Sequence, residues 1–398
     1  MAELSRKAMA VKPSSTLAIT AKAKELKAQG IDVVAFVAGE PDFDTPENIK
    51  DAAKAAMDAG FTKYTPAAGI LELRAAISKK FADFNKLEYK PEQIVVSNGG
   101  KHSLINAITA IANPGDEFII PAPYWLSYPE MVKLADGVPV SVLTKKENGY
   151  KVTVDELESV YTDKTKAIIL NTPCNPTGSI YTEEELRAIA DFVVKKDIFI
   201  ISDEMYEYLV YGGHKHVSIA SFNDEIYKRT ITCSGLSKSY AMTGWRIGYA
   251  AAPIEIAKLM SSVQSHQASN PNSIAQKAAL EAVTGPQERL AEMVCEFEKR
   301  SSYLYEAIGK LPYIDCVKPD GAFYAFVDCS EIIGKKHNGE EITSSADIGR
   351  ILIEEYKVAV IPCDDFGIKN HIRLSYAIAM EQIKKGIERI RTFLEALV

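Results

Sequence analysis

The 398-residue sequence has no long hydrophobic run and no block of charge of one sign. No stretch approaches the roughly 18 apolar residues of a membrane span, and the N-terminal segment lacks the continuous apolar region of a signal peptide. Its 46 basic and 53 acidic residues are interspersed and give a formal net charge of -7. This pattern argues against nucleic acid or a membrane as a partner, and we expect a soluble, cytoplasmic protein.

The common sequence signatures of metal and nucleotide sites are also missing. The six cysteines are widely separated and form no C-x-x-C pair, so we expect neither a disulfide framework nor a zinc site. No two glycines are two positions apart, and no G-K-[ST] occurs. The G-x-G dinucleotide fingerprint and the P-loop are therefore excluded, and any bound phosphate needs a different cradle.

Short apolar runs alternate with amphipathic helical patterns over most of the chain. This alternation predicts an α/β fold with a mostly parallel, seven-stranded sheet covered by helices. The predicted strands are Ile94–Ser97, Glu117–Pro121, Val138–Leu143, Ala167–Asn171, Ile198–Asp203, Thr230–Cys233 and Ile247–Ala250.

The pattern changes beyond about Pro286, where a long charged helical segment begins. The expected elements that follow are helices at 287–311 and 345–356 and strands at 322–327, 358–361 and 371–375. With 47% hydrophobic residues the chain can form two or three domains. We expect an N-terminal arm at 1–45 that packs on the C-terminal part, a large domain at 46–286, and a smaller α+β domain at 287–398.

Unusual residues follow several predicted strands, where open α/β sheets place their sites. Asn98-Gly99-Gly100 precedes a helix and exposes backbone N–H groups that suit a phosphate, although such a Gly-Gly pair alone is more often only a tight turn. Asp203 is the last residue of its predicted strand, and Tyr206 stands three positions later. In isolation, Asp203 is equally a helix N-cap. Asn175 precedes a proline, which favours a rigid turn.

Lys238 follows a predicted strand and is surrounded by serines, a glycine and Tyr240 rather than by a polar helical face. Burial lowers the pKa of a lysine toward the neutral amine, the form that makes a Schiff base with an aldehyde. The alternative is a lysine that caps a loop. Arg246, between Trp245 and Ile247, then suits an anion. An amine, an aspartate, an arginine and a glycine turn are the groups that pyridoxal phosphate requires.

Eight motifs distributed along the whole chain support this interpretation. They are AGEPDFDTP from Ala38, KYTPAAG from Lys63, SNGGK from Ser97, PYWLSYP from Pro123, NTPCNPTG from Asn171, SDEMY from Ser202, SKSYAMTGWRIGY from Ser237 and RLSY from Arg373. With these motifs the chain resembles the fold type I pyridoxal phosphate-dependent aminotransferases of class I/II. The resemblance is strongest to their bacterial aspartate and aspartate/prephenate branch.

The resemblance implies roles in holding pyridoxal 5'-phosphate. Lys238 should bond to the aldehyde and later move a proton between the substrate and the cofactor. Asp203 should pair with the ring nitrogen, Tyr206 and Asn175 should hydrogen-bond the phenolic oxygen, and Trp125 should stack on the ring.

The cofactor's phosphate is expected to be held by several groups together. These are Gly99, Gly100, Ser237 and Arg246, with Lys101 as a further candidate. Tyr64 should reach the phosphate in a neighbouring subunit, so a homodimer with shared active sites is expected.

Substrate binding is implied for Arg373, which offers a planar fork to the α-carboxylate with help from Asn175, Gly39 and Trp125. One departure from the family is Gly235, where some members have a serine; Ser234 or the backbone is expected to substitute. A second departure is that no arginine occurs between Arg246 and Arg289 to bind a distal carboxylate.

Lys101 is the candidate that we assign to this distal carboxylate. It stands in the first turn of a helix, where the helix dipole disfavours a cation. Lys12, Ser15 or Thr16 of the arm is expected to assist it. The alternatives are a solvated lysine or a phosphate contact.

The expected function is transfer of an amino group between L-aspartate, or a related amino acid, and 2-oxoglutarate by a ping-pong route. Alternatives are a prephenate or aromatic preference, or a different reaction on the same scaffold, such as a carbon–sulfur lyase. A non-enzymatic cofactor-binding regulator would need a DNA-binding domain, for which the sequence leaves no room. The six histidines fall in no motif and are expected to be solvated or core residues.

Overall fold

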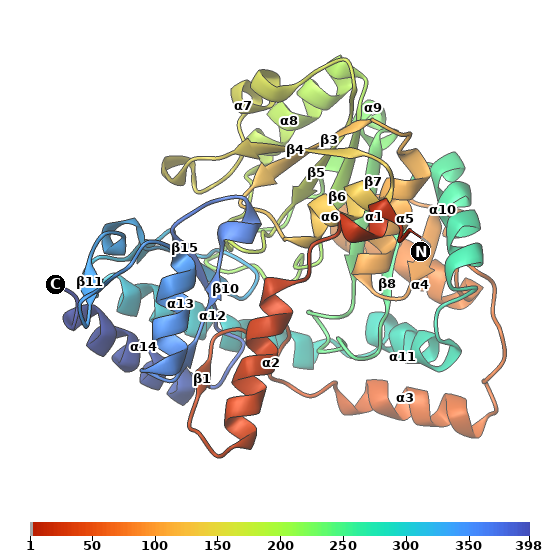
Figure 1. The fold of residues 1–398 in the computed structure, drawn as a ribbon. Coiled ribbons are helices and arrows are strands. Elements are labelled where there is room, and N and C mark those ends of the chain that lie inside the picture. The colour runs from red at the N-terminus through yellow and green to blue at the C-terminus, as the bar shows by residue number, and fades with distance from the viewer. Residues whose placement is uncertain (1–2) are drawn as a thin grey trace.

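A seven-stranded sheet forms the centre of the computed structural model, which describes residues 3–398 (Figure 1). Its strand order is β2-β8-β7-β6-β5-β3-β4. The strands are β2 (Ile94–Ser97), β3 (Glu117–Ala122), β4 (Val138–Leu143), β5 (Thr165–Asn171), β6 (Phe199–Asp203), β7 (Thr230–Gly235) and β8 (Gly248–Ala251). Only β8 runs antiparallel to its neighbours. The predicted α/β class and mostly parallel sheet are therefore confirmed, and all seven strands were correctly located.

Helices cover both faces of this sheet because its strands are apolar on both sides. In β3, Phe118 and Ile120 pack in one hydrophobic cluster, whereas Ile119 packs in another. This alternation is the two-residue period of a strand buried on both faces. The covering helices are α3 (Glu47–Asp58), α4 (Leu71–Lys80), α5 (Gly100–Ile111), α6 (Ser127–Leu134), α7 (Val154–Val160), α8 (Glu183–Lys196), α9 (Asp224–Tyr227), α10 (Ile254–Gln267) and α11 (Ser273–Thr284).

The C-terminal part has a second sheet, with strand order β14-β15-β10-β9. Its strands are β9 (Asp315–Cys316), β10 (Tyr324–Asp328), β14 (Ile361–Pro362) and β15 (His371–Ser375). The helices beside it are α12 (Glu288–Ile308), α13 (Ser345–Glu354) and α14 (Met380–Glu395), and a two-stranded ribbon joins β11 (Lys336–His337) to β12 (Glu340–Glu341). The predicted strand 322–327 begins two residues later than expected, because Ala322 has a positive φ of 57° and lies in a turn.

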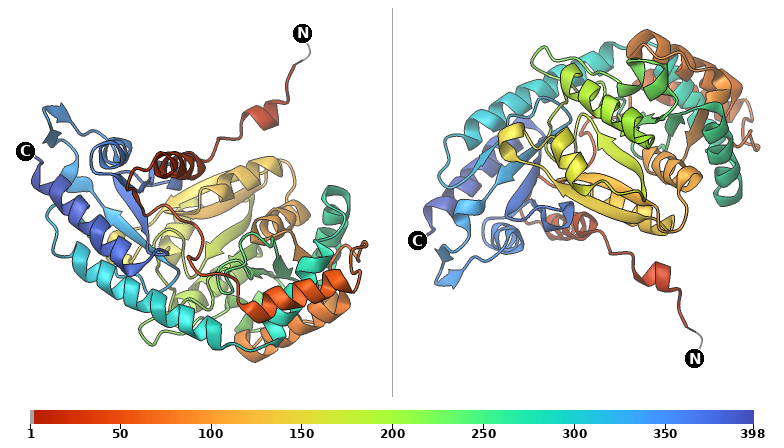
Figure 2. Two further views of the ribbon diagram at one scale, coloured as in Figure 1. Left: turned by 90° about the horizontal axis from the view of Figure 1, so that it is seen from below. Right: turned by 90° about the horizontal axis from the view of Figure 1, so that it is seen from above.

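The N-terminal arm lies against this C-terminal part. It contains α1 (Arg6–Met9), α2 (Ser15–Ala28) and β1 (Val34–Ala35), and β1 pairs in parallel with β13 (Val358–Ala359). Figure 2 shows α1 projecting from the body of the chain. Lys7 of α1 forms a salt bridge with Asp136, which follows α6. The first two residues of the predicted arm lie outside the described residues, and the division into domains at 45 and 286 stays a prediction.

Two expectations from composition can be compared with this fold. No helix among residues 3–398 is long and apolar enough to cross a membrane. All six cysteines are free, as expected from their spacing.

Candidate active site

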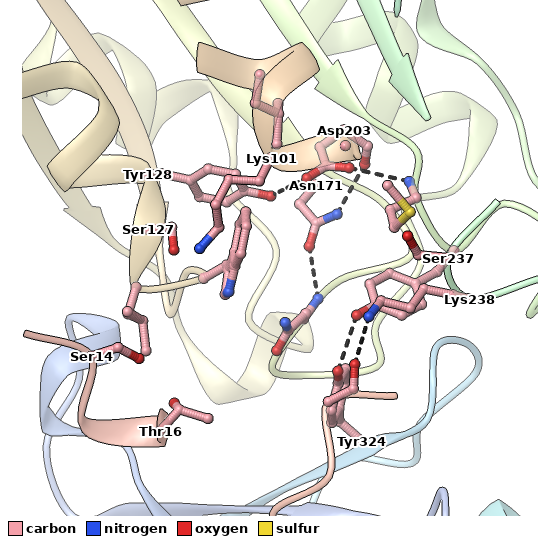
Figure 3. A pocket seen from close by; sticks show the side chains of 18 of the residues that line it. Ser14, Thr16, Lys101, Ser127, Tyr128, Asn171, Asp203, Ser237, Lys238 and Tyr324 are labelled. Atoms are coloured by element: carbon pink, nitrogen blue, oxygen red, sulfur yellow. Dashed lines mark hydrogen bonds between the residues drawn. The ribbon is translucent and has the colours of Figure 1, made fainter. Parts of the chain in front are cut away.

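A pocket of about 260 Å³ lies at the carboxyl ends of the central strands (Figure 3). It brings together the N-terminus of α5, the ends of β5 and β6, the loop after β7, β15 and the arm. The predicted site residues that line it are Gly39, Gly100, Lys101, Trp125, Asn175, Asp203, Tyr206, Ser237, Lys238, Arg246 and Arg373. Gly99 lies just behind the lining, and Tyr64, which is 90% exposed, lies outside it.

Lys238 and Lys101 are the two lysines that line this pocket among residues 3–398. The Nζ of Lys238 donates a hydrogen bond of 2.5 Å to the carbonyl oxygen of Gly39. Burial lowers the pKa of Lys238 to about 8, against the opposing effect of the Glu40 carboxylate. An amine with this pKa reaches its neutral, nucleophilic form close to neutral pH.

Asp203 ends β6 and is buried. Its carboxylate accepts hydrogen bonds from the Tyr128 hydroxyl, at 2.6 Å, and from the Met205 N–H, at 3.2 Å. Burial raises the pKa of Asp203 to about 6, and the Tyr128 hydrogen bond limits this rise. Residues 205–208 form a turn, so the alternative of a helix N-cap is wrong. The carboxylate is held ready to pair with a cationic group in the pocket.

Arg373 is 2% exposed and offers hydrogen-bond donors to the pocket. Its Nη1 donates to Asn175 Oδ1 at 3.0 Å, and its guanidinium lies 4.3 Å from the ring centroid of Tyr324. Its Nε and Nη2 are buried and have no hydrogen-bond partner among residues 3–398. Buried charged donors of this kind need an acceptor, and two of them on one guanidinium fit a carboxylate.

Gly99 and Arg246 form a second anion cradle. Gly99 is the N-cap of α5 with φ of 88°, and a Cβ built on it would lie 2.3 Å from Arg246 Nη2. The missing side chain thus lets the guanidinium approach the helix N-terminus. Arg246 itself adopts a positive φ of 55°, a conformation that costs free energy in a residue other than glycine. A helix N-terminus beside an arginine is suited to a phosphate or a similar anion.

The serine that was expected to replace the missing family serine does not reach the pocket. Ser234 is fully buried, and its hydroxyl donates to Glu207 Oε1 at 2.6 Å. Gly235 is needed for packing, because a Cβ there would lie 3.1 Å from the Gly248 Cα. The expectation for Ser234 is wrong, since the strand turns its side chain to the opposite face.

Lys101 is the second residue of α5, as predicted, and its Nζ lies 4.8 Å from the centroid of the Trp125 ring. Burial lowers the pKa of Lys101, and the nearby Arg246 charge lowers it further. Of the arm residues expected near it, Thr16 lines the pocket, whereas Lys12 and Ser15 do not. Ser14, which was not predicted, also lines it. In Figure 3, Ser14 and Thr16 lie across the cavity from Lys238.

Several pocket residues escaped the sequence reasoning. Tyr128 stands three positions after Trp125 in a motif that was recognised, so helical spacing could have suggested it. Tyr324 accompanies Tyr206, with 3.1 Å between the two hydroxyl oxygens, but no local signal links residues 118 positions apart. Asn171 accepts from the Asn175 N–H at 2.7 Å and orients the turn that carries Asn175.

Comparison with known proteins agrees with this pocket. The family model described as aminotransferase class I and II matches residues 31–390. The aspartate aminotransferase of Bacillus subtilis is 48% identical over 99% of both chains, and the aspartate/prephenate aminotransferase of Cereibacter sphaeroides is 48% identical over 100% of both. The solved structure of the Thermus thermophilus aspartate aminotransferase with maleate has a TM-score of 0.92 and 44% identity, covering 99% of this chain and 100% of that one. The chain therefore belongs to the class I and II aminotransferases, and its reaction is transamination.

Proposed function

We propose that the chain is a pyridoxal 5'-phosphate-dependent aspartate aminotransferase that exchanges an amino group between L-aspartate and 2-oxoglutarate. The observation that carries this proposal is the placement of two separate anion sites in one pocket with Lys238. Arg246 with the α5 N-terminus suits the cofactor's phosphate, and the free donors of Arg373 suit the substrate's α-carboxylate.

The residues present fit the proposed cofactor. When bound, pyridoxal phosphate supplies an aldehyde for amines and an electron sink for the carbanion formed at the substrate's Cα. Lys238 would hold the aldehyde carbon, and Asp203 would face the ring nitrogen. Tyr206 and Asn175 would donate to the phenolic oxygen, and Trp125 would cover the ring. Gly99, Gly100 and Ser237 would join Arg246 at the phosphate.

The chain's own groups would then carry out binding, orientation and proton transfer. Arg373, held by its hydrogen bond to Asn175, would bind the α-carboxylate in the same pocket as the Lys238 amine. Burial lowers the pKa of the Lys238 amine to about 8, so this amine would accept the proton of the substrate's Cα and transfer it to the cofactor. The buried Asp203 carboxylate stabilises positive charge on the cofactor side of the pocket.

The preference for aspartate is supported by the names of the relatives and by Lys101. Relatives from Bacillus subtilis and Geobacillus stearothermophilus are named aspartate aminotransferases, and maleate, a dicarboxylate, is present in the Thermus structure. Lys101 places a second cation in the pocket, apart from Arg373. Acceptance of prephenate is the second candidate, because other relatives of similar identity are named aspartate/prephenate aminotransferases. A substrate panel scored by kcat/KM decides between them.

The direct test is a half-reaction. Purified protein loaded with pyridoxal phosphate is mixed with L-aspartate alone, and pyridoxamine phosphate is measured. Its formation, and its reversal by 2-oxoglutarate, are the expected result. Failure to form pyridoxamine phosphate from L-aspartate, together with release of pyruvate and sulfide from L-cysteine in a parallel assay, would instead indicate a carbon–sulfur lyase.

Lys101→Ala tests the assignment of the distal carboxylate. We expect kcat/KM for aspartate and glutamate to fall by an amount that corresponds to about 2 kcal/mol of lost transition-state stabilisation, the contribution of one charge-assisted hydrogen bond. Steady-state kinetics with alanine and aromatic donors provide the control, since these lack a distal carboxylate and should react at nearly unchanged rates. An equal loss for all donors, or weaker cofactor binding, would move Lys101 to the phosphate.

Tyr128→Phe removes the hydroxyl that donates to Asp203 and leaves the ring in place. This hydrogen bond lowers the pKa of Asp203, so its loss should raise that pKa further above about 6. A carboxyl with a higher pKa is protonated over a wider acidic range. The acid limb of the pH profile of kcat/KM should therefore move upward by about one pH unit, with recovery at alkaline pH. An unchanged profile would mean that Tyr128 only packs.

We also propose that two copies of the chain share their active sites. Tyr64 is 90% exposed in the single chain, which is consistent with a tyrosine that reaches a neighbouring subunit. Equilibrium sedimentation, together with complementation between Tyr64→Phe and Lys238→Ala chains, would test this. The cytoplasmic location and the three-domain division remain predictions from the sequence.

A further inference from the structure

A buried polar cluster lies beside the pocket and takes no part in the proposed reaction. The turn after β6 carries Asp203 and Tyr206, which line the pocket, and also Glu204 and Glu207, which do not. Glu204 is 0% exposed and Glu207 is 2% exposed. Two carboxylates at this depth require donors and countercharges, because burying an unpaired charge is very costly.

Glu207 finds its partners on three different segments. Its Oε1 lies 2.5 Å from Lys80 Nζ of α4 and accepts from Ser234 Oγ of β7 at 2.6 Å. Its Oε2 accepts from Asn85 Nδ2 at 2.8 Å, at the end of the short helix η1 (Phe81–Asn85). Although burial opposes ionisation, the charge of Lys80 and these hydrogen bonds hold the pKa of Glu207 below its usual value.

Glu204 is held by hydroxyl, amide and imidazole groups. Its Oε1 accepts from Ser202 Oγ at 2.9 Å. Its Oε2 accepts from Ser218 Oγ at 2.6 Å and from Asn85 Nδ2 at 3.3 Å, and lies 2.8 Å from His216 Nε2. Every neighbour can act as a donor, which is the environment of an ionised carboxylate.

This cluster resembles a metal site by distance but not by chemistry. One potential ligand atom from each of Glu204, Glu207 and His216 lies within 4.8 Å of the others. The Lys80 ammonium, however, already occupies the position of a countercharge, and the carboxylate oxygens already accept hydrogen bonds. The group is therefore a hydrogen-bond network in which both carboxylates have partners, rather than a ligand set awaiting an ion.

In this network, His216 Nε2 lies 2.8 Å from Glu204 Oε2 and 3.4 Å from Ser218 Oγ. Its side chain is 1% exposed, and its Nδ1 has no hydrogen-bond partner among residues 3–398. A neutral imidazole with its proton on Nε2 fits these surroundings, since Nε2 then donates to Glu204 and no buried N–H is left without an acceptor.

The network is coupled to Asp203 through charge as well as through the backbone. The adjacent Glu204 carboxylate raises the pKa of Asp203. The other titratable groups that feel Glu204 are Tyr89, Cys233 and Tyr249, whose pKa values are all raised by burial, so they stay neutral and add no charge. Lys80 pairs with Glu207, and the Nε2–H of His216 faces Glu204, the carboxylate next to Asp203.

We propose that His216 is a positioning residue for Asp203. Its hydrogen bond to Glu204 anchors the turn that follows Asp203 and carries Tyr206. The same N–H also weakens the negative potential that Glu204 exerts on Asp203. This inference rests on the proposed function, because it concerns the hold of Asp203 on a cationic cofactor ring. His216 itself touches neither the pocket nor any group in it.

The test compares three variants. His216→Leu removes the donor, His216→Gln restores an N–H in a similar place without any possible charge, and His337→Leu is the matched control. His337 also pairs with a glutamate, with 2.9 Å between its Nε2 and Glu355 Oε2, a side chain 4% exposed and an unpartnered Nδ1, but its glutamate is 45% exposed and His337 does not line the pocket. Both Leu variants should lower Tm, and His216→Leu should lower it more, because the glutamate left behind is buried there and half exposed in the control.

Only His216→Leu should change the site. We expect a roughly tenfold weaker Kd for pyridoxal phosphate, measured by absorbance titration of apo-protein, and an upward shift of the acid limb of kcat/KM. His216→Gln should recover both quantities. Because the Kd is measured without substrate, it reports on the site independently of turnover.

Two results would overturn the inference. One is a His216→Leu protein whose Kd and pH profile match those of His337→Leu, which would leave His216 a purely structural residue. The other is a His216→Gln protein as impaired as His216→Leu, which would exclude the hydrogen bond as the cause. A wild-type protein that neither binds pyridoxal phosphate nor transaminates would refute the proposed function instead.

Discussion

A Lys238→Ala variant is expected to bind pyridoxal phosphate without a covalent bond and to lose about four orders of magnitude in transamination rate. The loss is large because Lys238 has two tasks, bonding to the aldehyde and moving the Cα proton. The pocket prepares its amine for both, since burial lowers the pKa of Lys238 to about 8 while Gly39 accepts one of its protons in a hydrogen bond. Single-turnover kinetics with L-aspartate measure the effect.

Borohydride reduction identifies the bonded lysine directly. In the wild-type protein the reduced cofactor should appear on the peptide that contains Lys238, as determined by mass spectrometry. Lys101→Ala is the matched control, because it removes the other lysine of the pocket and should leave the label in place. Label on any other lysine would refute the assignment of Lys238.

An Asp203→Asn variant is expected to lower kcat by about a thousandfold while the protein remains folded. The replacement keeps the size of the side chain but removes the negative charge that stabilises a protonated ring nitrogen. No other carboxylate lines the pocket in the described part of the chain, so no other lining residue can replace this charge. The proton-abstraction step should slow most.

A primary isotope effect with Cα-deuterated aspartate measures that step. It should rise in Asp203→Asn, since proton abstraction becomes rate-limiting. Asp203→Glu provides the control, as it restores a charge at a displaced position and should recover part of the rate. Near-normal turnover in Asp203→Asn would mean that the side chain only stabilises the following turn, by accepting a hydrogen bond from the Met205 N–H.

Much of the central fold could be predicted because the signals are local. Each strand of the large sheet is a short apolar run between helical patterns, and β2, β4 and β15 begin and end where the sequence predicts. The same local reasoning located Lys238, Asp203 and the Gly99-Gly100 turn, since each lies at the end of a strand or within three residues of it. Parallel strands bring such junctions to one edge of the sheet, so their meeting in one pocket also follows.

Errors arose where side-chain direction or distant contacts decide. Ser234 was expected in the pocket, but the two-residue period of β7 turns it toward Glu207. Asp203 was equally a helix cap by sequence, and only the turn that follows it removed that alternative. The strand expected at 358–361 divides into β13 and β14, which pair with different partners.

The sequence alone determined which chemical groups this protein carries and which strands and turns present them, because propensity, hydrophobic period and turn residues act over a few neighbours. Only the tertiary structure decided which groups meet. The bond between Tyr128 and Asp203 spans 75 positions, and that between Arg373 and Asn175 spans 198. The network of Glu204, His216 and Lys80 likewise depends on packing among distant segments. Such contacts are set by the register and burial of whole elements, which no short stretch of sequence encodes.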